Sequence, residues 1–444
     1  MARGDKLRAM KLLLVGGGGR EHALAWRIMF EHPDCVLIAA PGNPGIVALA
    51  HCAPVAAADV AGLVTLALQQ QVDAVIVGPE APLAAGLADA LQARGVPVFG
   101  PTAAAAQIET SKAFAKALMH DAGVPTARAS MHTSVLSAKA AARQFGAPVV
   151  IKASGLAAGK GVVVAMTLDE ADAAISSMLE HDVFGDAGAE VLVEEFMTGE
   201  ELSLFVLTDG ETAVPLPAAQ DHKRVGEGDT GPNTGGMGAY CPADAGDASF
   251  TWRTGSVPAG VQQVLDVIIA PTLAALRARD MPFRGLLYCG VMLTPTGPRV
   301  VEFNCRFGDP ETQAVLTALA DDAPLLRVML QIARGERIDP VPVFAPARSV
   351  VATVIAAAGY PGTPRGGDSI ALPASDDGEW LFHAGTTRVD DTLRTSGGRV
   401  LAATATGATL AEAQQRSAAL ATRVEFTGAF HRRDIGWRAL ARGA

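Results

Sequence analysis

The first regular segment of the chain reads KLLLVGGGGREHALAWRIMF, residues 11–30. The run at residues 11–15, which is apolar from residue 12 to residue 15, is typical of a buried strand, and a helical pattern at residues 20–30 follows the glycines. The same alternation continues to about residue 100, and the apolar runs end in Gly16, Pro41, Gly78 and Gly100. It predicts a βαβ series with a parallel sheet and with ligand loops at the carboxyl ends of the strands. The predicted strands are residues 11–15, 36–40, 72–77 and 96–99, and the predicted helices are residues 20–30 and 82–94.

The pattern changes after a helical stretch at residues 112–122, which Gly123 closes. Residues 137–197 alternate helix, strand, glycine-rich loop, strand, helix and strand, which predicts a small α+β lobe. The predicted elements are a helix at 137–145, strands at 149–152 and 161–165, a helix behind the capping box of Thr167 and Glu170, and a strand at 191–195.

Beyond the lobe, residues 201–208 predict a hairpin that turns at Asp209 and Gly210. Residues 220–238 are rich in glycine and charge and lack apolar periodicity, so we expect an ordered functional loop without helix or strand. The remaining predicted elements are a helix at 262–279, strands at 285–293 and 299–304, a helix from about Glu311, strands at 349–356 and 399–406, and a helix at 410–420.

The fold class that follows is α/β and α+β with several domains. We expect an N-terminal βαβ domain at residues 1–111 and a small lobe with its connecting helix at 112–197. A central domain at 198–338 and a β-rich C-terminal domain at 339–444, after a proline-rich linker, complete the chain.

Composition limits the class of protein. The chain has 444 residues, 49% of them apolar and 18% charged, which excludes a disordered chain. A net charge of −10 offers no electropositive field to nucleic acid. Prolines and glycines interrupt the longest uncharged stretch, and the first apolar run is too short for a signal peptide, so we expect a soluble cytoplasmic protein. Five scattered cysteines without a CxxC pair predict reduced thiols.

Residues 16–19 are four glycines between a predicted strand and a predicted helix. Free backbone N–H groups and the helix dipole favour a phosphate here, with a purely structural glycine turn as the alternative. A dinucleotide site is disfavoured, because the third glycine of GxGxxG falls on Glu21 and strand 36–40 ends in Pro41 instead of an acid. Two further loops, residues 41–45 and 78–80, should lie at the same sheet edge.

A second glycine-rich segment reads KASGLAAGKG, residues 152–161. It is not a Walker loop, because three residues instead of four separate the glycines and no Ser or Thr follows Lys160. A loop that folds over a triphosphate from Lys152 and a plain hairpin with a solvated lysine fit this segment equally well.

The sharpest chemical signal is VVEFNCR, residues 300–306. Glu302, Asn304 and Arg306 would point to one face of a strand, with Val301, Phe303 and Cys305 toward a core. Carboxylate and amide oxygens beside a cation suit Mg²⁺ bound through nucleotide phosphates. The alternative, a solvated polar face, does not explain the turn that follows at residues 308–311.

Several motifs together resemble a known family. They are VGGGGREH (15–22), GLAAGKG (155–161), QDHKR (220–224), NTGGMGAY (233–240) and RFGDPETQ (306–313). In this order they resemble the phosphoribosylamine–glycine ligases, the glycinamide ribonucleotide synthetases of purine biosynthesis. The resemblance runs from residue 11 to about residue 437 and implies an ATP-grasp enzyme with N-terminal, clasp, central and C-terminal domains.

The resemblance implies that ATP lies between the lobe and the central sheet, with a divalent cation, Mg²⁺ or Mn²⁺. Glu302 and Asn304 would bind the metal, and Glu201 would hold the ribose hydroxyls. The Glu194 side chain and the backbone of the next three residues would read the adenine edge. The full set of implied nucleotide ligands is Lys112, Lys152, Gly159, Lys160, Gly161, Glu194, Glu195, Phe196, Met197 and Glu201.

The resemblance also implies the substrate residues. Glycine would be held by Asp221, Arg306, Gly308 and Asp309, and the catalytic residues would be Arg306, Lys152 and Asp309. The ribose phosphate would be held by the N-terminal loops with two later residues, which are Gly17, Gly18, Gly19, Asn43, Gly45, Glu80, Lys223 and Gly236. Ser154 departs from the family, which usually has Asp there, and loop closure could differ for that reason.

The implied chemistry is physically consistent. A carboxylate is a poor electrophile, so glycine would first attack the γ-phosphate of ATP, and the ribosylamine nitrogen would then displace phosphate. No enzyme nucleophile is needed. We expect a monomer that acts on small molecules, with at most transient contact with the enzyme that supplies phosphoribosylamine. The alternative functions are another ATP-grasp ligase or carboxylase, and a nucleotide-binding regulator without catalytic activity.

Overall fold

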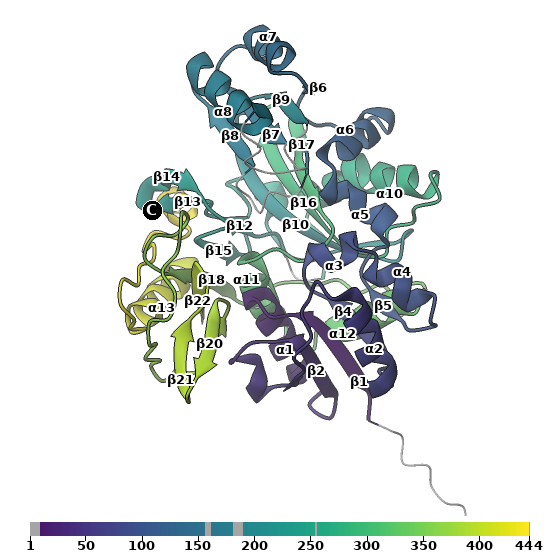
Figure 1. Ribbon diagram of the computed structural model, residues 1–444, viewed down its shortest axis with the longest axis vertical. Helices are drawn as coiled ribbons and strands as arrows, with labels where there is room; N and C mark the ends of the chain where they lie inside the picture. The colour runs from purple at the N-terminus through teal and green to yellow at the C-terminus, as the bar shows by residue number, and fades with distance from the viewer. Residues whose placement is uncertain (1–8, 156–160, 181–189, 254, 444) are drawn as a thin grey trace, which may run out of the picture.

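The computed structural model describes residues 9–155, 161–180, 190–253 and 255–443. Figure 1 shows the small lobe at one end of the long axis and the N-terminal and C-terminal parts side by side at the other end. The central sheet lies between them. The predicted fold class, α/β and α+β with several domains, is confirmed.

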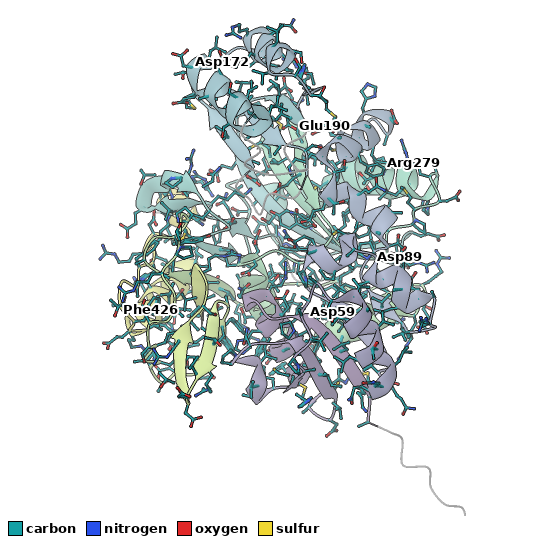
Figure 2. All side chains as sticks on the ribbon, viewed as in Figure 1. Asp59, Asp89, Asp172, Glu190, Arg279 and Phe426 are labelled. Carbon is teal, nitrogen blue, oxygen red and sulfur yellow. The ribbon has the colours of Figure 1, made fainter. Side chains whose placement is uncertain are left out.

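The N-terminal part is a five-stranded parallel sheet with strand order β3-β2-β1-β4-β5. Strand β1 is apolar from residue 12 to residue 15 because both faces of the sheet are covered there, and these four residues are fully buried. Asp59 and Asp89 of this part are exposed, and Figure 2 shows Asp89 at the edge of the molecule. The elements are β1 (Lys11–Gly16), α1 (Gly19–Glu31), β2 (Val36–Pro41), β3 (His51–Cys52), α2 (Val60–Gln70), β4 (Ala74–Val77), α3 (Glu80–Ala84), α4 (Leu87–Gln92) and β5 (Val98–Phe99).

The strand-end loops of this sheet converge, as predicted. A Cβ atom on Gly17 would lie 2.3 Å from the carbonyl oxygen of Gly42, so the two loops touch at a point where only glycine fits. The prediction of a single helix at residues 82–94 is wrong in one respect. The structure has two helices in this region, α3 and α4, because Gly86 between them has a φ of 83°.

The lobe contains a four-stranded antiparallel sheet of order β6-β9-β7-β8 with two helices packed on it. Half of the predicted capping box forms, since the Glu170 N–H donates to Thr167 Oγ1 (3.2 Å). The Glu170 carboxylate accepts from the N–H of Met166 (2.7 Å), one residue before the cap, instead of from Thr167. Two helices, α5 and α6, connect the lobe to the N-terminal part. The elements are α5 (Ala103–Thr110), α6 (Lys112–Asp121), β6 (Ala129–His132), α7 (Val135–Phe145), β7 (Val149–Ala153), β8 (Val162–Ala165), α8 (Leu168–Glu180) and β9 (Val191–Glu195).

The central sheet is antiparallel with order β11-β10-β16-β17, and its first two strands form the predicted hairpin. The predicted helix at 262–279 is one run with a π-turn at Leu265–Ile269. Among the described residues, this run, Ala259–Arg277, alone has the length and apolar composition of a membrane span, and half of its most apolar window is buried in the protein. The elements are β10 (Glu200–Thr208), β11 (Ala213–Pro215), α9 (Ala259–Val264), α10 (Ala270–Arg277), β16 (Gly285–Thr294), β17 (Gly297–Asn304), α11 (Glu311–Ala318) and α12 (Leu325–Ala333).

Residues 220–238 are not free of regular structure, so that prediction is wrong. They contain β12 (Gln220–Asp221), β13 (Arg224–Gly226) and β14 (Thr230–Asn233) and lead into β15 (Gly238–Cys241). The β13–β14 hairpin turns through Gly228 and Asp229, both with positive φ. Apolar alternation does not mark this hairpin in the sequence, because none of the residues of β13, β14 or their turn is fully buried.

The C-terminal strands extend a sheet that begins in residues 220–241. Its order is β12-β15-β18-β22-β19, so strands from both sides of residue 339 share one sheet. The elements are β18 (Ser349–Ala356), β19 (Glu379–His383), β20 (Thr386–Val389), β21 (Thr392–Thr395), β22 (Arg399–Gly407), α13 (Leu410–Thr422) and α14 (Trp437–Arg442). The five cysteines are free, as predicted.

Arg27 ties the N-terminal part to the central domain. Its side chain is 1% exposed and pairs with Glu31 at 2.6 Å, while its other end donates to the carbonyls of Ala320 and Ala323, both at 2.9 Å. Glu31 in turn accepts from the Leu326 N–H at the start of α12 (2.9 Å). The buried arginine therefore satisfies groups on both sides of the contact between α1 and the α11–α12 connection.

Replacing Arg27 by Met should lower the free energy of unfolding by about 3–5 kcal/mol, because Glu31 is left charged and unpaired in the interior. Denaturant or thermal unfolding measures this change. Arg337→Met is the control, since Arg337 and its partner Glu211 are mostly exposed (79% and 61%), and it should shift stability by no more than about 0.5 kcal/mol. Equal shifts in the two variants would contradict the interpretation.

Candidate active site

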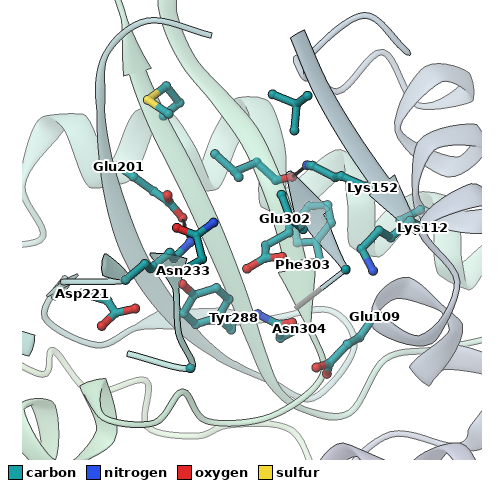
Figure 3. Close-up of a pocket in the computed structure, with 18 of the residues that line it drawn as sticks. Glu109, Lys112, Lys152, Glu201, Asp221, Asn233, Tyr288, Glu302, Phe303 and Asn304 are labelled. Carbon is teal, nitrogen blue, oxygen red and sulfur yellow. Dashed lines mark hydrogen bonds and ion pairs between the residues drawn. The ribbon is translucent and has the colours of Figure 1, made fainter. Parts of the chain in front are cut away.

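A cavity of about 570 Å³ lies where the lobe, the central sheet and the N-terminal part meet. Its walls come from β7 and β9 of the lobe, from β10, β16 and β17, and from α5 and α6. Figure 3 shows Lys112 and Lys152 on one side of Glu302, and Glu201 and Asp221 on the other. Oppositely charged groups therefore face one another across one partly open cavity.

The lobe side of the cavity carries three lysines around one glutamate. Glu194 is 2% exposed and pairs with Lys152 at 2.8 Å and with Lys116 at 3.1 Å. Burial alone would raise the pKa of Glu194, but the two lysines outweigh it and lower that pKa. Lys112 donates to the Gly155 carbonyl at 3.0 Å, and burial lowers the pKa of Lys112 and Lys116. Lys116 was not predicted, although its i,i+4 spacing from Lys112 puts both on one helix face.

A β-bulge in the β16–β17 pairing shifts the alternation of side chains along β17. Val300 is fully buried, whereas Val301 and Glu302 are both partly exposed and line the cavity. The prediction that Val301 faces the core is therefore wrong, and Val300 takes that position. Phe303 and Cys305 are buried, as predicted.

Glu302 and Asn304 lie side by side at the end of β17 and offer two oxygen ligands. Burial would raise the pKa of Glu302, but Lys223 and the lobe lysines lower it, so the carboxylate is charged. In the amide orientation that satisfies both atoms, Asn304 donates to Glu109 Oε1 at 3.0 Å. Among the described residues no cluster of three His, Cys, Asp or Glu side chains could hold a metal. Two protein oxygens completed by nucleotide phosphates are the donor set that Mg²⁺ accepts.

Arg306 lies beyond β17, in the turn before α11, and not in the strand row that the sequence predicts. Its guanidinium is held between Glu80 at 3.2 Å and Glu109 at 3.0 Å. Glu109 also accepts from the Cys305 N–H at 2.7 Å, and burial raises its pKa. Sequence reasoning missed Glu109, and no motif or spacing marks it.

Lys223 pairs with Glu201 at 2.6 Å. Among the cations that lower the pKa of Glu302, Lys223 has the largest effect. The structure therefore brings Lys223 to the Glu201 and Glu302 side of the larger cavity.

A second group of acids lies next to Lys223. Asp221 is packed against Gly236, where a Cβ atom would lie 2.8 Å from Asp221 Oδ1. Glu311 accepts from Ser203 Oγ at 3.2 Å, and both acids line the cavity. Burial is the main cause that raises the pKa of Asp221 and of Glu311, and the repulsion from Glu311 adds to the shift of Asp221. Glu311 was not predicted as a site residue.

Backbone groups of the N-terminal glycine loop form hydrogen bonds with other residues of the protein. The Gly18 N–H donates to Glu21 at 2.6 Å. The Asn43 amide donates to the carbonyls of Gly17 at 3.0 Å and His383 at 2.7 Å. These contacts hold the loops against each other and against the C-terminal strands.

A second cavity of about 430 Å³ opens beside Gly18. Asp309 and Arg399, together with Thr234 and Gly235, line both cavities, so the two cavities are adjacent. Arg399 donates to the Asp309 carbonyl at 2.5 Å, and Gln313 donates to the Asp309 carboxylate at 2.8 Å. Tyr360 and Arg399 come from the C-terminal part, from which no site residue was predicted.

The predicted site residues divide into groups. Most of them line the larger cavity, namely Glu80, Lys112, Lys152, Gly161, Glu194, Glu195, Phe196, Met197, Glu201, Asp221, Lys223, Glu302, Asn304, Arg306 and Asp309. Gly18 lines the second cavity. The remaining described residues, which are Gly17, Gly19, Asn43, Gly45, Gly236 and Gly308, line neither. Gly159 and Lys160 lie outside the described residues.

Comparisons with known proteins agree along the chain. Three models of the phosphoribosylglycinamide synthetase family match this chain. The N domain matches residues 10–109, the ATP-grasp (A) domain residues 110–312 and the C domain residues 350–438. Phosphoribosylamine–glycine ligase of Mesorhizobium japonicum is 48% identical over 435 residues, which cover 98% of this chain and 99% of that protein. The enzyme of the same name from Pseudomonas aeruginosa is 47% identical over 439 residues, 98% of this chain and 99% of its own.

Solved structures show the same architecture. The crystal structure of phosphoribosylamine–glycine ligase from Thermotoga maritima has a TM-score of 0.81 at 32% identity and covers 96% of this chain and 100% of its own. Biotin carboxylase from Campylobacter jejuni has a TM-score of 0.71 at 14% identity, covers 95% of this chain and 92% of its own, and shows a similar fold alone.

If Glu302 and Asn304 hold the metal, as the resemblance implies, replacing Glu302 by Gln should weaken the binding of Mn²⁺ in the presence of a non-hydrolysable ATP analogue by at least about tenfold. The substitution removes the negative charge of the side chain but keeps its shape. Titration followed by the Mn²⁺ spin-resonance signal measures this. Glu336→Gln, at an exposed position, is the control and should bind Mn²⁺ normally. Normal binding in the Glu302 variant would remove this residue from the metal site.

Proposed function

Because the chain belongs to the phosphoribosylglycinamide synthetase family, we propose that it joins glycine to 5-phosphoribosylamine through a glycyl phosphate formed in the larger cavity. The chain is a phosphoribosylamine–glycine ligase, which acts in de novo purine biosynthesis. As an ATP-grasp enzyme it uses ATP and a divalent metal. The observation that carries the proposed route is the convergence of Lys152, Glu302 and Arg306 on one cavity.

In the first step, a glycine carboxylate oxygen bonds to the γ-phosphorus of ATP, and the bond from that phosphorus to the ADP oxygen breaks. Lys152 and Lys112 face the cavity and would balance phosphate charge. Glu302 and Asn304 would hold the cation, which we propose to be Mg²⁺ or Mn²⁺ and which would neutralise charge on the phosphates. We assign the adenine edge to the segment from Glu194 to Met197, where Glu194 already pairs with two lysines.

Glycine would lie toward the Asp221 and Asp309 side of the same cavity. Arg306 would orient its carboxylate, since Glu80 and Glu109 keep the guanidinium in one place. Asp221 has a buried oxygen without a hydrogen-bond partner among the described residues, and its neighbour Glu311 is also acidic. Two acids whose pKa burial raises would gain from an incoming ammonium group.

In the second step, the amine nitrogen bonds to the glycyl carbonyl carbon, the carbon–oxygen bond to phosphate breaks, and the nitrogen loses a proton. We place the ribose phosphate at the N-terminal glycine loops and the second cavity, which shares Asp309 and Arg399 with the first. Water would hydrolyse the acyl phosphate, so an enclosed site serves both steps.

Other functions fit less well. A silent nucleotide-binding regulator would not need Glu302, Asn304 and Arg306 together at the cavity wall. Another ligase or carboxylase of this architecture would use the same nucleotide wall but a different second substrate. We further propose that the chain acts as a cytoplasmic monomer, with at most transient contact with the enzyme that supplies the labile amine.

Oxygen tracing tests the glycyl phosphate. With glycine labelled by ¹⁸O in its carboxylate, one labelled oxygen should appear in the phosphate released during turnover, because the carboxylate oxygen that attacked phosphorus leaves with it. Mass spectrometry of the phosphate measures this, and ADP release with each substrate omitted is the companion assay. Unlabelled phosphate in a complete reaction would exclude the proposed intermediate.

Replacing Gly18 by Val should raise the KM for phosphoribosylamine at least about tenfold, because even its Cβ would lie 2.8 Å from the Glu21 carboxylate and the added bulk faces the second cavity. Binding of a non-hydrolysable ATP analogue should change little, since the nucleotide wall is built from other segments. Calorimetry and steady-state kinetics on the folded variant separate the two. Lost nucleotide binding with an unchanged KM for the amine would reverse the assignment of the two cavities.

A further inference from the structure

The β13–β14 hairpin with its flanks, residues 222–234, forms one wall of the larger cavity, and we call it the active-site hairpin. At its inner end, Lys223, Asn233 and Thr234 line the cavity. Thr234 donates to the Lys223 carbonyl through its N–H at 2.7 Å and through its hydroxyl at 2.9 Å. The position of Lys223 therefore depends on the pairing of the two strands at the inner end of this hairpin.

The hairpin has little support of its own. Its strands have three and four residues, and their pairing is irregular between Arg224 and Gly226. None of the residues of these strands or their turn is fully buried. A two-stranded ribbon without an apolar face is at best marginally stable in water, so something outside the hairpin must hold it.

Arg432, near the end of the chain, supplies that support. It is 1% exposed, and its guanidinium pairs with Asp229 at 2.9 Å and donates to the Arg224 carbonyl at 3.0 Å. The other edge of the guanidinium makes two bonds to the Asp434 carboxylate, both at 2.8 Å. Asp434 accepts from the Gly228 N–H at 2.8 Å. One buried cation thus joins β13 and the turn of the hairpin to the C-terminal segment.

Residues that follow in the chain add to the same contact. Trp437 donates to Asp229 at 3.2 Å, and Arg438 pairs with Asp229 at 2.7 Å. The Gly436 N–H donates to His222 Nε2 at 3.0 Å. Burial lowers the pKa of His222 to about 4, so the ring is neutral and can accept this bond.

We infer that Arg432 is a positioning residue for catalysis, which holds the active-site hairpin from outside and thereby sets Lys223 at the cavity wall. Lys223 reaches from this hairpin to Glu201 at 2.6 Å, so a shift of the hairpin displaces a charge inside the site. A charge-assisted network around a planar guanidinium is directional and fixes orientation as well as distance. The inference rests on the proposed function, in which we keep Lys223 as a residue that helps to hold the ribose phosphate of phosphoribosylamine, as the resemblance implies, from the wall of the larger cavity.

The test uses Arg432→Gln in the full-length chain, with Arg433→Gln as the matched control. Arg433 pairs with Glu227 of the same hairpin at 3.2 Å, but it is 75% exposed. Amide hydrogen exchange within residues 222–234 and kcat/KM for phosphoribosylamine are both measured. In Arg432→Gln we expect exchange there to accelerate at least about tenfold and kcat/KM to fall at least about tenfold. Both quantities should stay within about twofold of the parent in Arg433→Gln, because an exposed pair contributes little.

A second comparison shows whether the effect passes through Lys223. In a Lys223→Met background, adding Arg432→Gln should reduce kcat/KM by no more than about twofold. A further loss of tenfold or more, or faster exchange with unchanged kcat/KM in the single variant, would overturn the inference. If Arg432→Gln does not fold, Asp229→Asn removes the partner on the hairpin and is expected to act in the same way. Unchanged kcat/KM in Lys223→Met alone would contradict the proposed role of Lys223, while the exchange rates would still report whether Arg432 holds the hairpin.

Discussion

The arrangement of the site depends on the ion pairs of Arg306 with Glu80 and Glu109. Glu80 begins α3 in the N-terminal part, Glu109 lies in α5, and Arg306 follows the central strand β17. Burying a charge without an opposite charge beside it has a large desolvation penalty, so these ion pairs favour the arrangement in which the three elements bring Arg306 to both glutamates. Because Asn304 contacts Glu109 as well, the same contact fixes the end of the strand that carries Glu302.

The cavity walls carry their charges in pairs. Glu194 lies between Lys152 and Lys116, and Glu201 lies against Lys223. A site for phosphates needs cations that are partly removed from water, and an internal carboxylate keeps such cations from being buried alone. Nucleotide phosphates and a divalent cation can then enter a space where charge is already balanced, with little rearrangement of the walls.

Local patterns in the sequence were sufficient for the elements that have apolar periodicity, as strands β9 and β18 show by forming at the predicted residues. The β13–β14 hairpin was missed because its support comes from Arg432, about two hundred residues away in the sequence. The bulge in β17 was missed because one extra residue in a pairing leaves no mark in the composition of the strand. Glu109, Lys116 and Arg399 are ordinary charged residues until the fold brings them to the cavities.

The sequence by itself determined most of the strands and helices with apolar periodicity, the glycine loops at strand ends and the motifs that identify the family. These features depend on residues close together in the chain, where periodicity and backbone freedom act directly. Only the tertiary structure decided which charges meet: Arg306 with Glu80 and Glu109, Lys223 with Glu201, and Asp309 with Arg399. The physical reason is that an ion pair forms between atoms a few ångströms apart, whatever their separation along the chain, and folding alone sets that distance.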